Sequence, residues 1–242
     1  MRPLDGITVV TLEHAIAAPF CTRQLADLGA RVIKIERPGS GDFARHYDER
    51  VRGLASHFVW TNRSKESLTL DVKHPQAQDV LAGLLERADV LVQNLAPGAA
   101  ARLGLSYAAL CDKHPRLIVC DISGYGANGP YQDRKAYDLL IQAESGFLSI
   151  TGTPDEPVKA VARSPTSQPA CTPTATSSRR SLRARRLGVA VVLASQCWKA
   201  WSNGWATRST TPSTVQRRRR ARAPLTPPSS PTARSRLATA RR

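Results

Sequence analysis

The sequence predicts an α/β protein whose first 160 residues form a doubly wound parallel sheet. Short runs rich in β-branched residues alternate with amphipathic helical patterns, and this alternation is typical of a sheet with helices on both faces. The runs are apolar at consecutive positions, as expected for strands buried on both sides. A third observation separates the rest of the chain, because no Asp or Glu follows Glu156 in the 242 residues.

The pattern predicts strands over residues 7–12, 31–36, 89–94 and 117–123. Between them it predicts helices over residues 18–28, over 75–88 with Pro75 near the start, and roughly over 100–114 with a break at Gly104. Ligand sites in such sheets lie at the carboxyl ends of the strands. We therefore expect the functional residues to follow the predicted strands.

Charge divides the chain into a domain over residues 1–160 and a tail over residues 161–242. The first part carries 18 Lys and Arg against 19 Asp and Glu, whereas the tail carries 17 Lys and Arg and no acid, which gives the net charge of +16. The dense Pro, Arg and Ser of the tail predict disorder, with a helix conceivable at 188–200. A basic arm could bind nucleic acid non-specifically, and this stays an alternative.

Five scattered cysteines give no disulfide framework and no metal-ligand spacing. The apolar run that ends at Leu12 is too short for a membrane span and does not fit a signal peptide. We expect a cytoplasmic protein with no metal and no permanently bound cofactor.

Gly124, Gly126 and Gly129 in "SGYGANGPY" match the spacing of a dinucleotide-binding loop. Such a loop must open a helix, and Pro130 opposes a helix there. We interpret these glycines as turn residues, with a nicotinamide-dependent oxidoreductase as the alternative.

Five phrases together resemble the class III CoA-transferases, a family that includes formyl-CoA transferase, carnitine CoA-transferase and the α-methylacyl-CoA racemases. They are "PLDGITVVTLE", "APFCTRQLADLGARVIKIERPGSGDFAR", "NRSKESLTLDVKHP", "ADVLVQNLAPGAAARLGLSYAAL" and "HPRLIVCDISGYGANGPYQDRKAYDLLIQAESG". The resemblance covers nearly all of residues 1–160 and implies an incomplete Rossmann-like half. It also implies that CoA or acyl-CoA binds as a substrate, and that apolar faces normally covered by the rest of the fold are exposed.

The resemblance assigns CoA-binding roles by position. It implies that Arg37 and Lys73 hold the nucleotide end and that Arg102 binds a phosphate. The residues implied along the adenine and ribose are Asn94, Leu95 and Ala96, and those implied along the pantetheine arm are Lys135, Ala136 and Tyr137. The racemases have a proton-carrying His where this chain has Tyr137, so CoA transfer is favoured over racemisation. His14 receives no role and is expected to be a satisfied structural histidine.

Family members use an aspartate nucleophile in a phrase like "xADIxAGMYA", but the corresponding window here reads "SPTSQPACTPT". No catalytic residue is therefore assigned. We also considered the gene in a shifted reading frame, in which the third base of each codon is read with the first two bases of the next codon. In that frame the window can encode Ala-Asp-Ile-Ser-Ala-Gly-Met-Tyr. The windows "QCWKAWSNGWAT" and "LTPPSSPTARS" also become family-like in that frame. We interpret the tail as an out-of-frame translation beginning near Ala160.

These observations predict a CoA-transferase that moves CoA between an acyl-CoA and a small carboxylic acid, truncated and inactive as translated. The resemblance implies an interlocked homodimer for intact members, which is doubtful for this chain. A CoA-binding protein without chemistry and a racemase relative remain alternatives.

Overall fold

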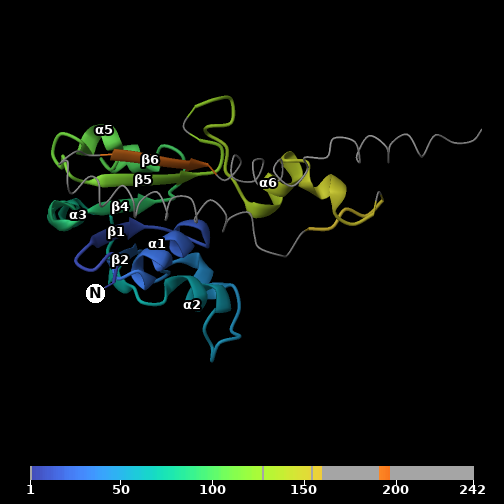
Figure 1. Cartoon of the computed structure of the whole chain (residues 1–242), viewed down its shortest axis with the longest axis horizontal. Coiled ribbons are helices and arrows are strands. Elements are labelled where there is room, and N and C mark those ends of the chain that lie inside the picture. Colours follow the sequence, from blue (N-terminus) through green and yellow to red (C-terminus); the bar gives the residue numbers. More distant parts are fainter. Residues whose placement is uncertain (1, 127, 154, 160–190, 197–242) are drawn as a thin grey trace, which may run out of the picture. The chain divides into compact units, whose positions relative to one another are not determined.

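A computed structural model of the chain describes residues 2–126, 128–153, 155–159 and 191–196. Its centre is a parallel sheet of six strands in the order β3-β2-β1-β4-β5-β6 (Figure 1). The strands are β1 (Thr8–Leu12), β2 (Arg31–Glu36), β3 (Glu66–Thr69), β4 (Val90–Gln93), β5 (Ile118–Ser123) and β6 (Val191–Gln196). The predicted doubly wound sheet is confirmed, and β3 is a strand that the pattern did not predict.

The helices are α1 (Ala17–Asp27), α2 (Ser56–Asn62), α3 (Pro75–Arg87), α4 (Ala99–Arg102), α5 (Tyr107–Leu110) and α6 (Asp138–Glu144). Two short 3-10 helices, η1 (Phe43–His46) and η2 (Phe147–Ile150), complete the described elements. The helix predicted over 100–114 is divided into α4 and α5, because Gly104 between them has a φ of 70°. The predicted break at this glycine is confirmed.

Two apolar cores lie on opposite faces of the sheet, because successive strand residues point to opposite sides. Val9, Val90 and Ile118 face one core with Leu25 of α1. Their neighbours in the strands face a second core, which includes Leu81 of α3. The helices α1 and α3 therefore cover opposite faces, and the strands β1, β4 and β5 are the buried centre.

Residues 191–196 correct the expectation for the tail. We allowed for a helix at 188–200, but Val191–Gln196 form β6, which pairs in parallel with β5 from Ile118 to Ser123. A short apolar run rich in valine fits a buried strand as well as a helix, and pairing with β5 decides between them. The other tail residues, including Cys171 and Cys197, lie outside the described part.

The glycine-rich segment after β5 is a turn, as predicted. Gly126 and Gly129 have φ angles of 96° and 107°, and the next helix, α6, begins only at Asp138. No helix opens at Gly129, so the described residues of this segment do not have the geometry of a dinucleotide-binding loop on which the oxidoreductase alternative depends.

Candidate functional site

All the strands run in the same direction, so their carboxyl ends meet at one edge of the sheet. Arg37 directly follows β2, Lys73 lies in the loop after β3, and Asn94 directly follows β4. His14 occupies the corresponding place after β1. Most of the residues predicted from sequence are therefore at the edge where ligands bind in this class of fold.

A polar cavity of about 270 Å³ lies at the ends of β2 and β3. Its lining residues are Glu36, Arg37, Gly39, Ser40, Gly41, Arg45, His46, Ser67 and Thr69. Three of these side chains are basic or can become so, and three carry hydroxyl groups. Such a lining suits an anionic, oxygen-rich group such as a phosphate.

Glu36 fixes one wall of this cavity. Arg45 donates from Nε and Nη2 to the two carboxylate oxygens of Glu36, both at 2.8 Å, and Ser67 Oγ donates at 2.7 Å. Burial alone would raise the pKa of Glu36, but these donors and the backbone N–H of Asp42 outweigh it and lower the pKa to about 2. Arg45 is thereby neutralised by Glu36. Within the described ranges, no carboxylate pairs with the exposed Arg37 guanidinium, which leaves it available to an anion.

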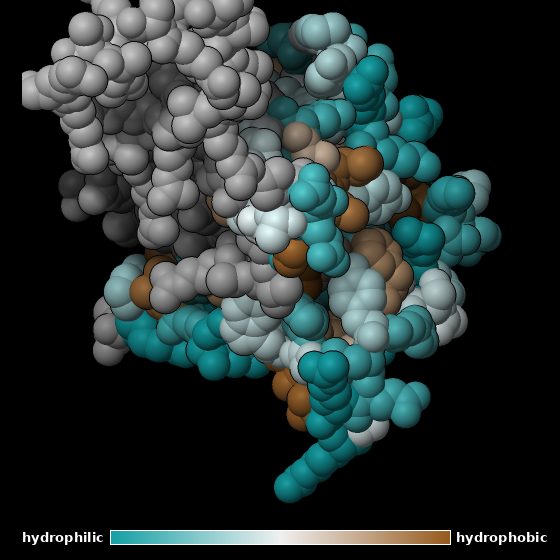
Figure 2. Space-filling model, turned by 90° about the vertical axis from the view of Figure 1, so that its right-hand side faces the viewer, coloured by the Kyte–Doolittle hydropathy of each residue, from teal (hydrophilic) through white to brown (hydrophobic). Residues whose placement is uncertain are grey.

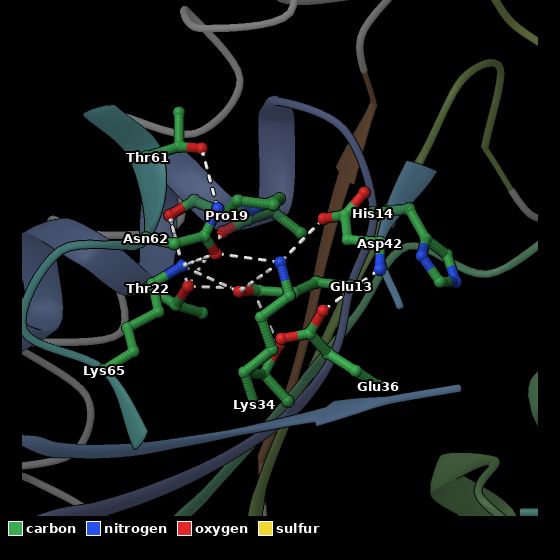
Figure 3. A network of polar contacts seen from close by, with 12 residues as sticks. Glu13, His14, Pro19, Thr22, Lys34, Glu36, Asp42, Thr61, Asn62 and Lys65 are labelled. Atoms are coloured by element: carbon green, nitrogen blue, oxygen red, sulfur yellow. Dashed lines mark hydrogen bonds and ion pairs between the residues drawn. The ribbon is translucent and has the colours of Figure 1, made fainter. Parts of the chain in front are cut away.

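A buried network of charged groups lies behind this edge (Figure 3). Lys34 Nζ donates to Asp42 at 2.6 Å and to Asn62 at 2.8 Å, and lies 3.9 Å from Glu13. Lys65 Nζ donates to Glu13 at 2.7 Å and to the Pro19 carbonyl at 2.8 Å. Burial lowers the pKa of Lys65, and Glu13 opposes this shift. Two ammonium groups thus face two carboxylates, which makes the network a neutral framework that holds the strand ends and α2 together.

Asn94 holds the turn after β1. The backbone N–H of His14 donates to Asn94 Oδ1 at 2.9 Å, and Asn94 Nδ2 donates to the His14 carbonyl at 3.0 Å. The Leu95 N–H donates to Gln93 Oε1 at 2.8 Å, so a hydrogen bond also holds this loop to β4. Asn94 therefore has a structural role in the described chain, because both its amide oxygen and its amide nitrogen bond the His14 backbone. The adenine contact expected of it is untested.

Arg102 lies beside the same loop. It ends α4, whose N-cap Gly98 is left-handed with a φ of 72°. A Cβ placed on Gly98 would lie 2.9 Å from Arg102 Nη1, so the guanidinium folds back over the start of α4. The Ala96 carbonyl accepts from the Ala99 N–H at 2.9 Å and closes this turn. The structure thus brings Arg102 together with the segment from Asn94 to Ala96.

The segment from Lys135 to Tyr137 returns to the end of β5. A Cβ on Gly124 would collide with the side chain of Ala136, so the glycine permits the two segments to touch. Tyr137 is 63% exposed and directly precedes α6. The pKa of Tyr47 is raised mainly by burial, then by Asp42, and Tyr137 is close enough to add to this shift. Lys135 is exposed and its predicted contact is untested.

Apolar surface is exposed beside these residues. On α6, Leu139 and Leu140 are 48% and 47% exposed, and on η1 Phe43 is 47% exposed. Figure 2 shows apolar patches among hydrophilic side chains on the side toward which the strands of Figure 1 run. That further protein covers this face stays a prediction.

Sequence reasoning missed Arg45, His46 and the Lys34 network. The only local signal was a lysine in the middle of the apolar run "RVIKIE", where a buried strand rarely carries a charge. The His14 expectation is corrected too: Nδ1 of its imidazole is buried and has no hydrogen-bond partner among the described residues. Groups of His, Cys, Asp and Glu able to hold a metal ion are absent from the described ranges. Nor does the described part contain a helix long and apolar enough to cross a membrane.

Comparisons with known proteins agree on one family. A family model described as CoA-transferase family III matches residues 4–184. The acetyl-CoA:oxalate CoA-transferase of Acetobacter aceti is 43% identical over 155 residues, which cover 64% of this chain and 40% of that protein. The succinyl-CoA:glutarate CoA-transferase of Mus musculus is 39% identical over 161 residues, covering 66% of this chain and 37% of that protein. The chain thus spans about two fifths of the length of these curated relatives.

Solved structures give the same result. A hypothetical protein, Rv3272, from Mycobacterium tuberculosis aligns with a TM-score of 0.80 and 31% identity over 88% of this chain and 60% of that one. A CAIB/BAIF family protein from Brucella suis aligns with a TM-score of 0.77 and 30% identity over 92% of this chain and 59% of that one.

Proposed function

Because the chain belongs to CoA-transferase family III, we propose that residues 1–160 form the CoA-binding half of an enzyme that moves CoA between an acyl-CoA and a small carboxylic acid. The observation that carries the proposal is the carboxyl edge of the sheet. Arg37 and Lys135 are exposed cations on loops at this edge, and Arg102 is an exposed cation at the end of α4. The polar cavity lined by Arg37 suits the phosphates of CoA.

We further propose that the chain as translated binds CoA without transferring it. Transfer in this family needs an aspartate carboxylate that attacks the thioester, and residues 161–242 contain no acid. The proposed cause is a shift of reading frame near Ala160. The family match continues past that residue to 184, so it does not itself mark the position of the proposed shift.

Two experiments test the frame directly. The DNA across the Ala160 and Val161 codons is resequenced, and the mass of the purified protein is measured. We expect one missing base relative to an open frame that encodes an aspartate about thirty residues after Tyr137. An intact base count together with a purified protein of the mass of the 242-residue chain would overturn the proposed shift.

A third experiment tests the chemistry on the frame-restored protein. Incubation with an acyl-CoA followed by hydroxylamine should give a hydroxamate on the restored aspartate, since hydroxylamine cleaves an aspartyl thioester. Replacing that aspartate with asparagine is the matched control and should abolish the product. A restored protein that gives no hydroxamate with any of several acyl-CoAs would contradict the proposed intermediate.

The racemase alternative concerns the same site. Tyr137 stands where the racemases have a proton-carrying histidine, and the phenol is a far weaker acid and base near neutral pH. We therefore propose transfer and not racemisation, and the interlocked dimer of intact members is proposed only for the frame-restored protein. Epimerisation of a 2-methylacyl-CoA by the restored protein would reverse this choice.

A further inference from the structure

The imidazole of His14 has unused hydrogen-bonding capacity. Its Nδ1 is buried and unpartnered among the described residues, a condition that destabilises a fold when nothing satisfies the atom. Buried polar groups in folded proteins are nearly always paired, so this exception calls for a partner outside the described residues. The ring lies apart from the Lys34 network and points away from it (Figure 3).

The position of His14 is the place where this fold binds ligands. The strand order β3-β2-β1-β4-β5-β6 runs in one direction from β1 to β3 and in the other from β4 to β6. In folds of this class, ligands bind outside the carboxyl ends of the two strands at such a reversal. His14 follows β1 and Asn94 follows β4, so these two residues follow the strands at the reversal.

The turn that carries His14 is held rigidly. Asn94 bonds both the N–H and the carbonyl of His14, at 2.9 and 3.0 Å. The next residue, Ala15, has a φ of 63°, a conformation that costs a non-glycine residue energy, and its N–H donates to Asp42 Oδ1 at 3.1 Å. Hydrogen bonds hold this strained turn from two sides. Such a turn is expected where a side chain is preorganised to bind a ligand.

The charge state of the ring narrows the class of ligand. Burial lowers the pKa of His14, and Arg37 and Lys34 add to this while Asp42 and Glu13 oppose it. The ring is therefore neutral at pH 7 and offers one donor and one acceptor nitrogen. A neutral imidazole complements an amide better than it complements a phosphate. The exposed arginines are better suited to bind the phosphates.

We propose that the His14 imidazole hydrogen-bonds an amide of the pantetheine arm of a bound acyl-CoA. This inference rests on the proposed CoA site. A CoA molecule that touches Arg37 after β2 and the segment from Lys135 to Tyr137 beside β5 has to cross the ends of β1 and β4, because these strands lie between the other two. Phe43 stacks on the imidazole with ring centres 5.7 Å apart and is 47% exposed, so a ligand can displace it without opening the core.

The test compares two ligands on the purified full chain by titration calorimetry. CoA has the pantetheine arm, and adenosine 3′,5′-bisphosphate represents the nucleotide end without it. His14→Phe keeps an aromatic ring and removes both nitrogens, and His14→Asn keeps an amide near the place of Nδ1. His114→Phe is the matched control, because His114 precedes β5 at the opposite edge of the sheet.

We expect His14→Phe to weaken CoA binding about tenfold, equivalent to about 1.4 kcal/mol, and to change bisphosphate binding less than twofold. His14→Asn should recover part of the CoA affinity, and His114→Phe should bind both ligands as the parent does. His14→Phe should also leave the midpoint of urea unfolding unchanged or raised, because it removes an unpaired buried nitrogen.

Four outcomes would overturn the inference. Equal weakening of both ligands would make His14 a structural residue, and unchanged CoA binding would mean that Nδ1 meets only water. If His14→Phe does not fold, a His14→Asn variant that folds and binds CoA more than tenfold more weakly than the parent counts against an amide contact. Failure of the parent chain to bind either ligand would remove the proposed CoA site and this inference together, whereas parent binding with an unaffected His14→Phe removes the inference alone.

Discussion

Glu13 and His14 are consecutive residues at the end of β1, but their surroundings differ. The Glu13 carboxylate accepts from Thr11 at 2.8 Å, Thr22 at 2.7 Å and Lys65 at 2.7 Å. His14 has no partner for its buried nitrogen among the described residues. The Glu13 carboxylate is thus satisfied inside the protein, whereas the His14 ring, which stacks on Phe43, keeps one buried nitrogen without a partner among the described residues. The difference separates a framework that holds the site from a position that meets the ligand.

The largest effect should come from breaking the framework. Lys34→Met leaves Asp42 and Glu13 buried without one of their two cations, and removing one partner of a buried ion pair costs about 3–5 kcal/mol. Urea unfolding followed by circular dichroism measures the loss. A loss below about 1 kcal/mol would mean that water reaches these carboxylates and that the network is no framework.

A smaller loss should follow from Asn94→Ala, which removes both hydrogen bonds to the His14 backbone. We expect the free energy of unfolding to fall by about 1–3 kcal/mol and CoA binding to weaken, since the turn after β1 is released. Asn128→Ala, at an exposed position after β5, is the control for the residue type. Full stability with unchanged CoA affinity would show that β1 and its neighbours hold the turn without Asn94.

Lowering the pH should reduce the free energy of unfolding through protonation of Glu36 in the cavity wall. Its pKa falls from the usual 4.5 to about 2 in the folded chain, so the folded state binds fewer protons at Glu36 than the unfolded state does between these values. The stability from Glu36 is present above pH 4.5 and is lost as the pH falls toward 2. Other acids such as Asp48 also titrate there, so the contribution is the difference between the parent and Glu36→Gln. Parallel profiles for the two proteins would contradict the shift.

The smallest effect should come from an exposed pair at the amino end of the sheet. Arg31 donates to both carboxylate oxygens of Glu66 at 2.8 Å, but the side chains are 61% and 55% exposed. Solvent and salt screen exposed pairs, so Arg31→Met should leave the unfolding midpoint nearly unchanged at low and at high salt. A loss as large as that of Lys34→Met would show that burial does not separate the two kinds of ion pair.

The fold was predictable where the signal is local. The strands β1, β2, β4 and β5 are dense in β-branched residues, and Gly104 interrupts a helix at the predicted place. The strand β3 was missed because "ESLT" is short and mostly exposed, without an apolar face. The run at 191–196 was ambiguous between helix and strand until its pairing with β5 was known.

The candidate site was predictable only through the family resemblance. It placed Arg37, Lys73 and Asn94 at the carboxyl edge, because order along the chain fixes which loop follows which strand. The pairing of Lys34 with Asp42 and of Lys65 with Glu13 depends on segments far apart in the sequence, so no local pattern contains it. The unpaired nitrogen of His14 is likewise a property of packing.

One measurement tests the central claim, that the first 160 residues hold a CoA site and the translated tail lacks the nucleophile. CoA exchange between a labelled acyl-CoA and a set of small carboxylates is measured for the chain as translated and for the frame-restored protein, which shares residues 1–160. We predict CoA binding but no exchange by the translated chain, and exchange by the restored protein. Exchange catalysed by the translated chain itself would contradict the account.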